Sequence, residues 1–151
     1  MAQTYDPVAR LNELIKDIEF TMLTTVRPDG SLHSCPMATH EVDADGVIWF
    51  FSHTNTEKVE AIRTDHRVNL AFSDADSQRY VSITGRCELV RDHIKAKELW
   101  KPVYETWFPK GVEDPNLILL KVHVQTADYW HTDQGRMVKL DGFAKTSIGS
   151  S

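Results

Sequence analysis

The sequence predicts an α+β fold in which about six strands form a small antiparallel barrel with flanking helices. Two observations lead to this prediction. Strand-like segments follow one another at hairpin spacing, and helical segments fill the gaps between them without alternating regularly with the strands. The length of 151 residues and the hydrophobic content of 41% fit a single domain with one core. A doubly wound parallel fold is therefore disfavoured.

The chain is expected to open with an amphipathic helix followed by a hairpin. Asp6 and Pro7 form an N-cap and a first-turn proline. Apolar residues then recur at helical spacing, at Val8, Leu11, Leu14, Ile15 and Ile18. Residues 20–26 and 31–38 are rich in β-forming residues and flank a turn at 27–30, so they predict two antiparallel strands.

The next segment predicts a buried strand and a short helix. After a turn at 43–46, residues 47–52 form a near-continuous apolar run, which is typical of a strand buried on both faces. Thr54 and Glu57 have the spacing of a capping box and predict a helix that ends near His66.

Two more strands are predicted at 68–73 and 79–90. In the second strand, apolar and polar residues alternate, and Gly85 marks a bulge or a close backbone approach. Asp92 is expected to cap a third helix that runs through Trp100 and is disturbed at Pro102.

The C-terminal part predicts a long strand at 117–129 and a last short strand at 136–140. The domain is expected to span residues 8–140, and residues 141–151 are expected to form a flexible tail.

Charge and cysteine content exclude several classes of protein. Seventeen Lys and Arg residues face 22 Asp and Glu residues, a net charge of −5 that argues against a nucleic-acid partner. Cys35 and Cys87 are far apart and form neither a disulfide framework nor a thiolate zinc site. No signal peptide or membrane span is visible, so a cytoplasmic protein is expected.

One segment combines the parts of an anion site. Residues 50–58 join a buried strand end, several hydroxyl and amide donors, a helix N-terminus and Lys58. A simpler interpretation is that Thr54 and Thr56 only cap the helix, and the local pattern alone favours it. Neither GxGxxG nor GxxxxGK[ST] occurs, which argues against a Rossmann or Walker phosphate loop.

Other candidate groups carry weaker signals. The seven histidines show no metal-ligand spacing, so no metal site is expected: His33, His40, His53, His66, His93, His123 and His131. Cys35 could be a nucleophile, although a half-buried thiol without a role is the simpler interpretation. Four tryptophans could stack on a planar ring or pack in the core: Trp49, Trp100, Trp107 and Trp130.

Motifs with a family resemblance extend over about residues 8–140. They are Phe20-Thr21-Met22-Leu23-Thr24-Thr25, Asp29-Gly30-Ser31-Leu32-His33-Ser34, Pro36-Met37, Trp49-Phe50-Phe51, Tyr80-Val81-Ser82-Ile83-Thr84-Gly85, Leu99-Trp100, Trp107-Phe108-Pro109-Lys110-Gly111, Asp114-Pro115 and Ala127-Asp128-Tyr129-Trp130. In this order and spacing they resemble the general-stress-protein branch of the pyridoxamine 5′-phosphate oxidase-like superfamily.

The resemblance implies a split β-barrel homodimer that holds FMN in clefts at the dimer interface. It implies phosphate contacts from Ser52, Thr56 and Lys58, with His53 nearby and Phe51 on the same strand. It also places Ser34, Cys35, Pro36 and Met37 along the flavin, and Trp130, with Trp107, against the ring across the interface. These roles favour the anion-site interpretation of residues 50–58.

The chain departs from the family at two places. Relatives commonly have an arginine at the position of Cys35, where it helps to hold the phosphate, so weaker FMN binding is expected unless Lys58 or Arg63 compensates. The basic C-terminal segment of the true pyridoxamine phosphate oxidases is also absent, so that activity is not expected.

The leading expectation is a small FMN-dependent oxidoreductase linked to stress responses, with an unknown substrate and no assignable catalytic acid or base. FAD or a deazaflavin is a possible cofactor. The alternatives are a non-catalytic flavin carrier or sensor, and a barrel that binds a deazaflavin or haem.

Overall fold

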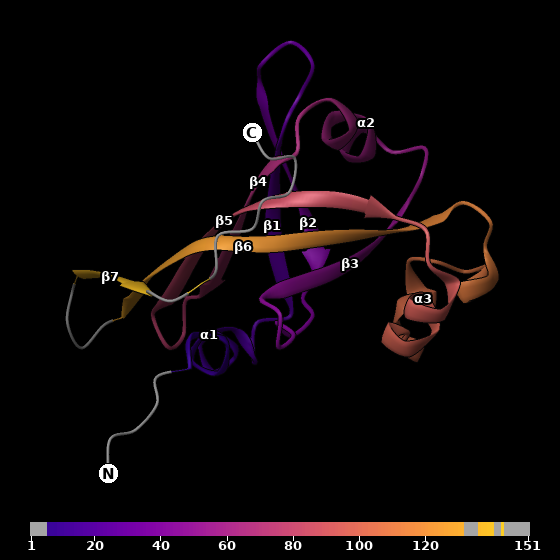
Figure 1. Cartoon of the computed structure of the whole chain (residues 1–151). Helices are drawn as coiled ribbons and strands as arrows, with labels where there is room; N and C mark the ends of the chain where they lie inside the picture. The colour runs from indigo at the N-terminus through magenta and orange to yellow at the C-terminus, as the bar shows by residue number, and fades with distance from the viewer. Residues whose placement is uncertain (1–5, 132–135, 141–142, 144–151) are drawn as a thin grey trace.

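The computed structural model describes residues 6–131, 136–140 and 143. Helices and strands follow one another in an irregular order along this part of the chain (Figure 1). Their bounds are α1 (Pro7–Ile15), β1 (Phe20–Val26), β2 (Leu32–Ala38), β3 (Val47–His53), α2 (Glu57–Thr64), β4 (Arg67–Asp74), β5 (Arg79–Val90), α3 (His93–Leu99), the 3₁₀ helices η1 (Pro102–Thr106) and η2 (Gly111–Glu113), β6 (Leu117–His131) and β7 (Arg136–Leu140).

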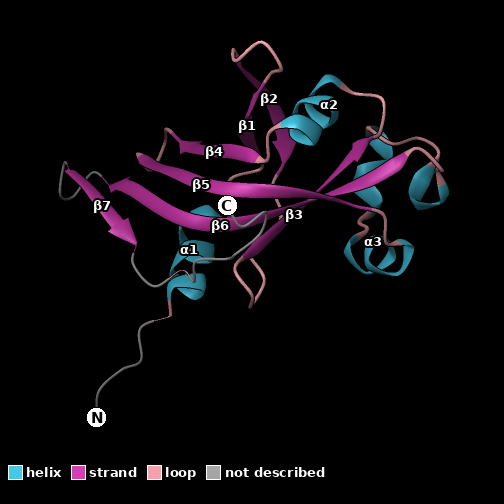
Figure 2. Cartoon of the chain, turned by 45° about the horizontal axis from the view of Figure 1, so that its top comes forward, coloured by secondary structure: helices cyan, strands magenta, loops and turns pink. Residues whose placement is uncertain are grey.

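The strands form one antiparallel sheet in the order β2-β1-β4-β5-β6-β3, with β7 added beside β6. The sheet is strongly curled, so that the β1–β2 hairpin runs across the direction of β5 and β6 (Figures 1 and 2). This arrangement is a split barrel, which confirms the predicted α+β class, and β7 brings the described strands to seven. The two ends of the strand order, β2 and β3, are not paired with each other.

Helix α1 begins where the sequence predicts. It ends before Ile18, the last apolar residue at helical spacing. Asp6 Oδ1 accepts hydrogen bonds from the N–H groups of Val8 and Ala9, at 3.1 and 3.2 Å. The helix ends at Ile15, yet Ile18 is still buried because the following turn returns it to the core.

Strand β3 is buried on both faces, as its apolar run predicts. Its first six residues are all buried. Ile48 and Phe50 pack in the main core, whereas Trp49 and Phe51 pack on the other side, in a second cluster that includes Tyr104. The strand is therefore held in place from both sides.

The predicted capping box at the start of α2 is wrong. The N-cap is Thr56, and no side chain caps the helix among the described residues. The backbone N–H of Thr54 is used instead in a hydrogen bond to the carbonyl oxygen of Asn116, and the Thr56 hydroxyl donates to the carbonyl oxygen of His53. Long-range contacts thus displace the local capping pattern.

Gly85 is the predicted bulge. The register between β5 and β6 shifts between Thr84 and Gly85. A Cβ atom at Gly85 would lie 2.4 Å from the carbonyl oxygen of His123, so only glycine allows the two backbones this approach.

The region after β5 is only partly predicted. As predicted, Asp92 caps α3 by accepting a hydrogen bond from the N–H of Lys95. Pro102 begins the separate 3₁₀ helix η1, whereas the sequence predicts only that the third helix is disturbed there. The predicted tail, residues 141–151, lies outside the described residues except for Phe143, which packs against the main core. Within the described chain, no helix has the length and apolar character needed to cross a membrane.

Candidate functional site

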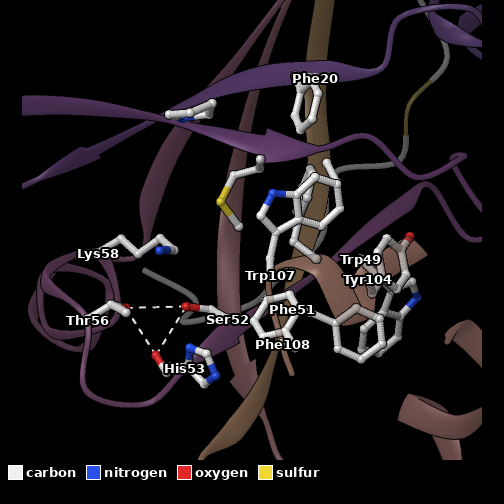
Figure 3. A pocket seen from close by; sticks show the side chains of 14 residues that line it. Phe20, Trp49, Phe51, Ser52, His53, Thr56, Lys58, Tyr104, Trp107 and Phe108 are labelled. Carbon is white, nitrogen blue, oxygen red and sulfur yellow. Dashed lines mark hydrogen bonds between the residues drawn. The ribbon is translucent and has the colours of Figure 1, made fainter. Parts of the chain in front are cut away.

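A cavity of about 310 Å³ lies where the two unpaired edge strands, β2 and β3, approach each other (Figure 3). Most of the residues proposed for cofactor binding line it together: Pro36, Met37, Phe51, Ser52, His53, Thr56, Lys58 and Trp107. Strand β2, strand β3, helix α2 and the segment after η1 each contribute side chains, so segments far apart in the sequence meet here.

One end of the cavity is polar. The buried Ser52 hydroxyl lies 3.1 Å from the carbonyl oxygen of His53 and 3.3 Å from Thr56 Oγ1. Thr56 Oγ1 donates to the same carbonyl oxygen at 3.1 Å. Lys58 also lines this end, and within the described chain no carboxylate forms an ion pair with it. Two hydroxyls and one available cation therefore face the cavity.

The N-terminus of α2 adds to this polar end. Because the Thr56 side chain bonds to His53, the first N–H groups of the helix are not capped by a side chain within the described part of the protein. Glu57, at the first helical position, would disfavour an anion, but its carboxylate is bound by Arg27. Uncapped N–H groups and Lys58 give the polar end the chemistry of an anion site.

The other end of the cavity is aromatic. Trp107 is 41% exposed and meets Phe20 edge-on, with ring centroids 5.7 Å apart. Phe51 packs against Tyr104 at 5.2 Å and against Phe108 at 6.2 Å. The polar and aromatic ends together form one amphipathic cavity (Figure 3).

Several lining residues were not proposed from the sequence. Phe20, Tyr104 and Phe108 line the cavity, and their aromatic character alone does not distinguish them from core residues. Trp49, one of the four tryptophans considered for ring stacking, also lines the cavity, and its indole N–H donates to Asp43 Oδ2 at 3.2 Å. This hydrogen bond fixes the Trp49 side chain.

Asp114 is a further residue that sequence reasoning missed. Its buried carboxylate lies 3.5 Å from His53 Nε2 and accepts a hydrogen bond from the N–H of Asn116 at 2.9 Å. Phe108 also packs against the His53 ring, with centroids 4.9 Å apart. His53 is therefore positioned by contacts with both Asp114 and Phe108.

Ser34 and Cys35 are close to the cavity without lining it. Ser34 is exposed, and its hydroxyl forms a 2.6 Å hydrogen bond with Thr24. Cys35 is half-buried and packs against the main core. Burial raises the pKa of the Cys35 thiol, Lys58 acts in the opposite direction and Glu57 raises it further. Cys35 directly precedes Pro36, which lines the cavity, and its thiol is subject to the opposite charges of Glu57 and Lys58 at the start of α2.

Trp130 is not part of the cavity of its own chain. Ser52 pairs with Ile118 near the start of β6, whereas Trp130 pairs with Tyr80 near the end of that strand. At about 3.3 Å per residue, roughly 40 Å of strand separate the two positions. Trp130 is 39% exposed there. Arg63, considered as a compensating cation, bonds to Glu60 and does not line the cavity.

Comparison with known proteins adds a family match. A family model described as pyridoxamine 5′-phosphate oxidase like matches residues 6–151. Protein bli-3 of Neurospora crassa is 28% identical over an alignment of 130 residues, and the match covers 79% of this chain. The chain spans only 62% of the length of that relative.

Solved structures share the fold. A Clostridium acetobutylicum protein related to general stress protein 26 of Bacillus subtilis has a TM-score of 0.75 and 22% identity, and covers 90% of this chain and 97% of its own. General stress protein 26 of Bacillus anthracis has a TM-score of 0.73 and 21% identity, with 88% and 98% covered. A putative general stress protein 26 of Jannaschia has a TM-score of 0.67 and 25% identity, with 83% and 80% covered.

The position of Cys35 beside Lys58 and Glu57 leads to a test by thiol alkylation at pH 8. The Lys58 charge favours the thiolate and the Glu57 charge opposes it. Lys58→Gln should therefore raise the pKa and slow the reaction of Cys35 with iodoacetamide about two- to threefold, and Glu57→Gln should accelerate it by a similar factor.

Arg63→Gln is the matched control on the same helix and should leave the rate unchanged, because Arg63 bonds to Glu60. Cys87 is an internal control, since deep burial raises its pKa and it should react only after unfolding. If Lys58→Gln and Glu57→Gln changed the alkylation rate of Cys35 in the same direction, the opposite effects of these two charges on the thiol would be contradicted.

Proposed function

Because the chain belongs to the pyridoxamine 5′-phosphate oxidase-like family, we propose that its cavity binds FMN and that the protein is a small oxidoreductase. Proteins of this family typically bind flavins. The observation that carries the proposal is the amphipathic cavity, in which an anion site and an aromatic wall face the same space. FMN has the matching two ends, a phosphate and a planar ring.

The residues present fit this cofactor. Ser52, Thr56, Lys58 and the N-terminus of α2 would hold the phosphate through hydroxyl, ammonium and N–H donors. Phe51 and Trp107 would contact the ring, and Pro36 and Met37 would line its approach from β2. Bound flavin supplies electron or hydride transfer, while the chain binds it, orients it and excludes water on the aromatic side.

The name general stress protein 26, carried by the structural relatives, suggests a role in stress responses for this chain as well. Pyridoxamine phosphate oxidation itself is not part of the proposal. FAD or a deazaflavin in the same cavity would be recognised by its absorbance spectrum.

We also propose that two copies complete each site. Paired residues of neighbouring strands share a face of the sheet, so the registers place Phe20, Met22, Tyr80 and Trp130 on one face. All four side chains are about 40% exposed, and exposed aromatic side chains are typical of protein interfaces. Trp130 does not line the cavity of its own chain, so we propose that it contacts a bound flavin from a second copy.

The first test concerns the charge at the polar end. Cys35→Arg should add a charge-assisted contact to the phosphate and tighten FMN binding by about 1.5–3 kcal/mol, a tenfold or larger decrease in Kd. Lys58→Ala should weaken binding by a similar factor. Titration with FMN, followed by quenching of flavin or tryptophan fluorescence, measures both.

Cys35→Met controls for bulk without charge and should leave Kd within about twofold of the wild-type value, since no charge-assisted contact is gained. A Cys35→Arg protein that is folded and binds FMN no better than the wild type would contradict the phosphate assignment. If the arginine prevents folding, unchanged FMN affinity in Lys58→Ala contradicts it equally.

The second test concerns the shared site. Light scattering should give the mass of a dimer, and Trp130→Ala should weaken FMN binding although Trp130 does not line the cavity of its own chain. Mixing unfolded Lys58→Ala and Trp130→Ala chains and refolding them together should restore tight binding at about a quarter of the sites, because half of the dimers are mixed and each has one intact site. A monomer, or no restoration, would contradict a site built from two copies.

The third test separates an enzyme from a flavin carrier. Under anaerobic conditions NADH or NADPH should bleach the bound flavin within seconds, and air should restore its absorbance. Flavin that stays bound and oxidised in the presence of both nucleotides would favour the carrier over an oxidoreductase that uses nicotinamide donors.

A further inference from the structure

The polar end of the cavity has less positive charge than a phosphate group carries negative charge. Of the described residues that line the cavity, Lys58 is the only one with a permanent positive charge. A phosphate monoester carries a charge of about −1.5 to −2 at pH 7. Glu57, beside Lys58 on α2, contributes no positive charge, and Arg27 is already bound to it. One further cation at this end would balance a bound phosphate.

His53 is the only other lining side chain, within the described chain, that can gain a positive charge. It is the last residue of β3, and its ring lies beside Ser52 at the polar end (Figure 3). The side chain is 32% exposed, so it is accessible to a ligand. The ring makes no hydrogen bond to a described residue, which leaves its N–H groups available.

Asp114 places a fixed negative charge next to this ring. Its side chain is 5% exposed, and Oδ2 lies 3.5 Å from His53 Nε2, which is ion-pair distance when the ring is protonated. Oδ1 accepts a hydrogen bond from the N–H of Asn116 at 2.9 Å. The carbonyl oxygen of Asn116 accepts one from the N–H of Thr54 at 2.8 Å, and Leu117 pairs with His53 in the sheet. The carboxylate is therefore held against the ring by the segment that also pairs with the end of β3.

The charge of an imidazole depends on its neighbours. Histidine changes its charge between pH 5 and 8, and negative neighbours favour the protonated form. The segments packed around the ring carry these titratable or charged side chains: Asp114, Lys110, Glu113, Lys58, Glu57, Arg27 and Cys35. Lys58 opposes protonation and Asp114 favours it, and a bound phosphate would be a second anion beside the ring.

We propose that His53 is the second cation of the phosphate site, and that its imidazole takes up one proton from solvent when the phosphate of FMN binds. Nε2–H is then directed to Asp114 and Nδ1–H to the phosphate. Asp114 is a positioning residue, because it acts on the ring and not on the ligand. The inference rests on the proposed function, since it assumes FMN as the ligand. Its consequence is that FMN binds more tightly at pH 6.5 than at pH 8.5.

The experiment compares FMN with riboflavin, which has the same ring and no phosphate. The full chain is titrated with each compound at pH 6.5 and at pH 8.5, followed by fluorescence quenching. The Kd for FMN should be at least about fivefold lower at pH 6.5, because a charge-assisted contact is gained. The Kd for riboflavin should change less than about twofold. At pH 6.5 the phosphate loses part of its own charge, an opposing effect that is the same in every variant.

His53→Gln keeps a polar side chain and cannot take up the proton. Its Kd for FMN should be no lower at pH 6.5 than at pH 8.5. Calorimetry at pH 7.5, in buffers of different ionisation enthalpy, measures the protons taken up on binding. The wild-type protein should take up a fraction of a proton that His53→Gln does not.

Asp114→Asn keeps the shape of the side chain and removes its charge. It should reduce the pH dependence of FMN binding, and the variant carrying both His53→Gln and Asp114→Asn should bind FMN no more weakly than His53→Gln alone. A merely structural role of Asp114 would instead weaken riboflavin and FMN binding equally at both pH values. His93→Gln is the matched control, because His93 pairs with Glu113 at 3.2 Å without lining the cavity, and it should leave the pH dependence intact.

Two results would overturn the inference while FMN still binds: a wild-type pH dependence that matches that of His53→Gln, or equal proton uptake by the two proteins. If His53→Gln does not fold, an Asp114→Asn protein with the full wild-type pH dependence overturns it equally. Absence of FMN binding at both pH values would contradict the proposed function itself, so the two failures are distinguishable.

Discussion

The structure depends on the incomplete closure of its sheet. The curl brings the edge strands β2 and β3 towards each other, but they do not pair. A fully closed barrel of this size would fill its interior with side chains. Here the unclosed position leaves a space whose walls come from both edges, from α2 and from the region after η1. Since β3 is packed on both faces, this space has a rigid side.

At the polar end of the cavity, a single side-chain hydrogen bond determines which helix donors stay uncapped. The hydroxyl oxygen of an N-cap threonine normally accepts a hydrogen bond from a backbone N–H in the first turn of its own helix. Thr56 bonds to the carbonyl oxygen of His53 instead, which ties the end of β3 to the start of α2 and leaves the helix N–H groups uncapped. The same contact therefore fixes the geometry of the turn and keeps its donors available. Arg27 complements it by binding Glu57.

The sequence is most informative where local physics decides the structure. The Asp6 cap, the buried run of β3 and the bulge at Gly85 follow from capping chemistry, hydrophobic pattern and the absence of a side chain. Prediction failed at the start of α2, where Thr54 bonds to distant Asn116, and around η1, whose path depends on packing against Phe51. The sequence likewise cannot show that Trp130 does not line the cavity of its own chain, because this depends on the register of β6. These features depend on contacts between distant segments, which no local pattern encodes.

The pairing of β3 with β6 also bears on how the protein is made. Strand β3 ends at residue 53, and its neighbour in the sheet begins at residue 117. During synthesis, β3 therefore emerges well before its partner, and it stays unpaired until β6 has been made. The cavity wall cannot exist in a nascent fragment that stops short of β6. A ligand of this cavity can therefore bind only to chains that have been synthesised through β6.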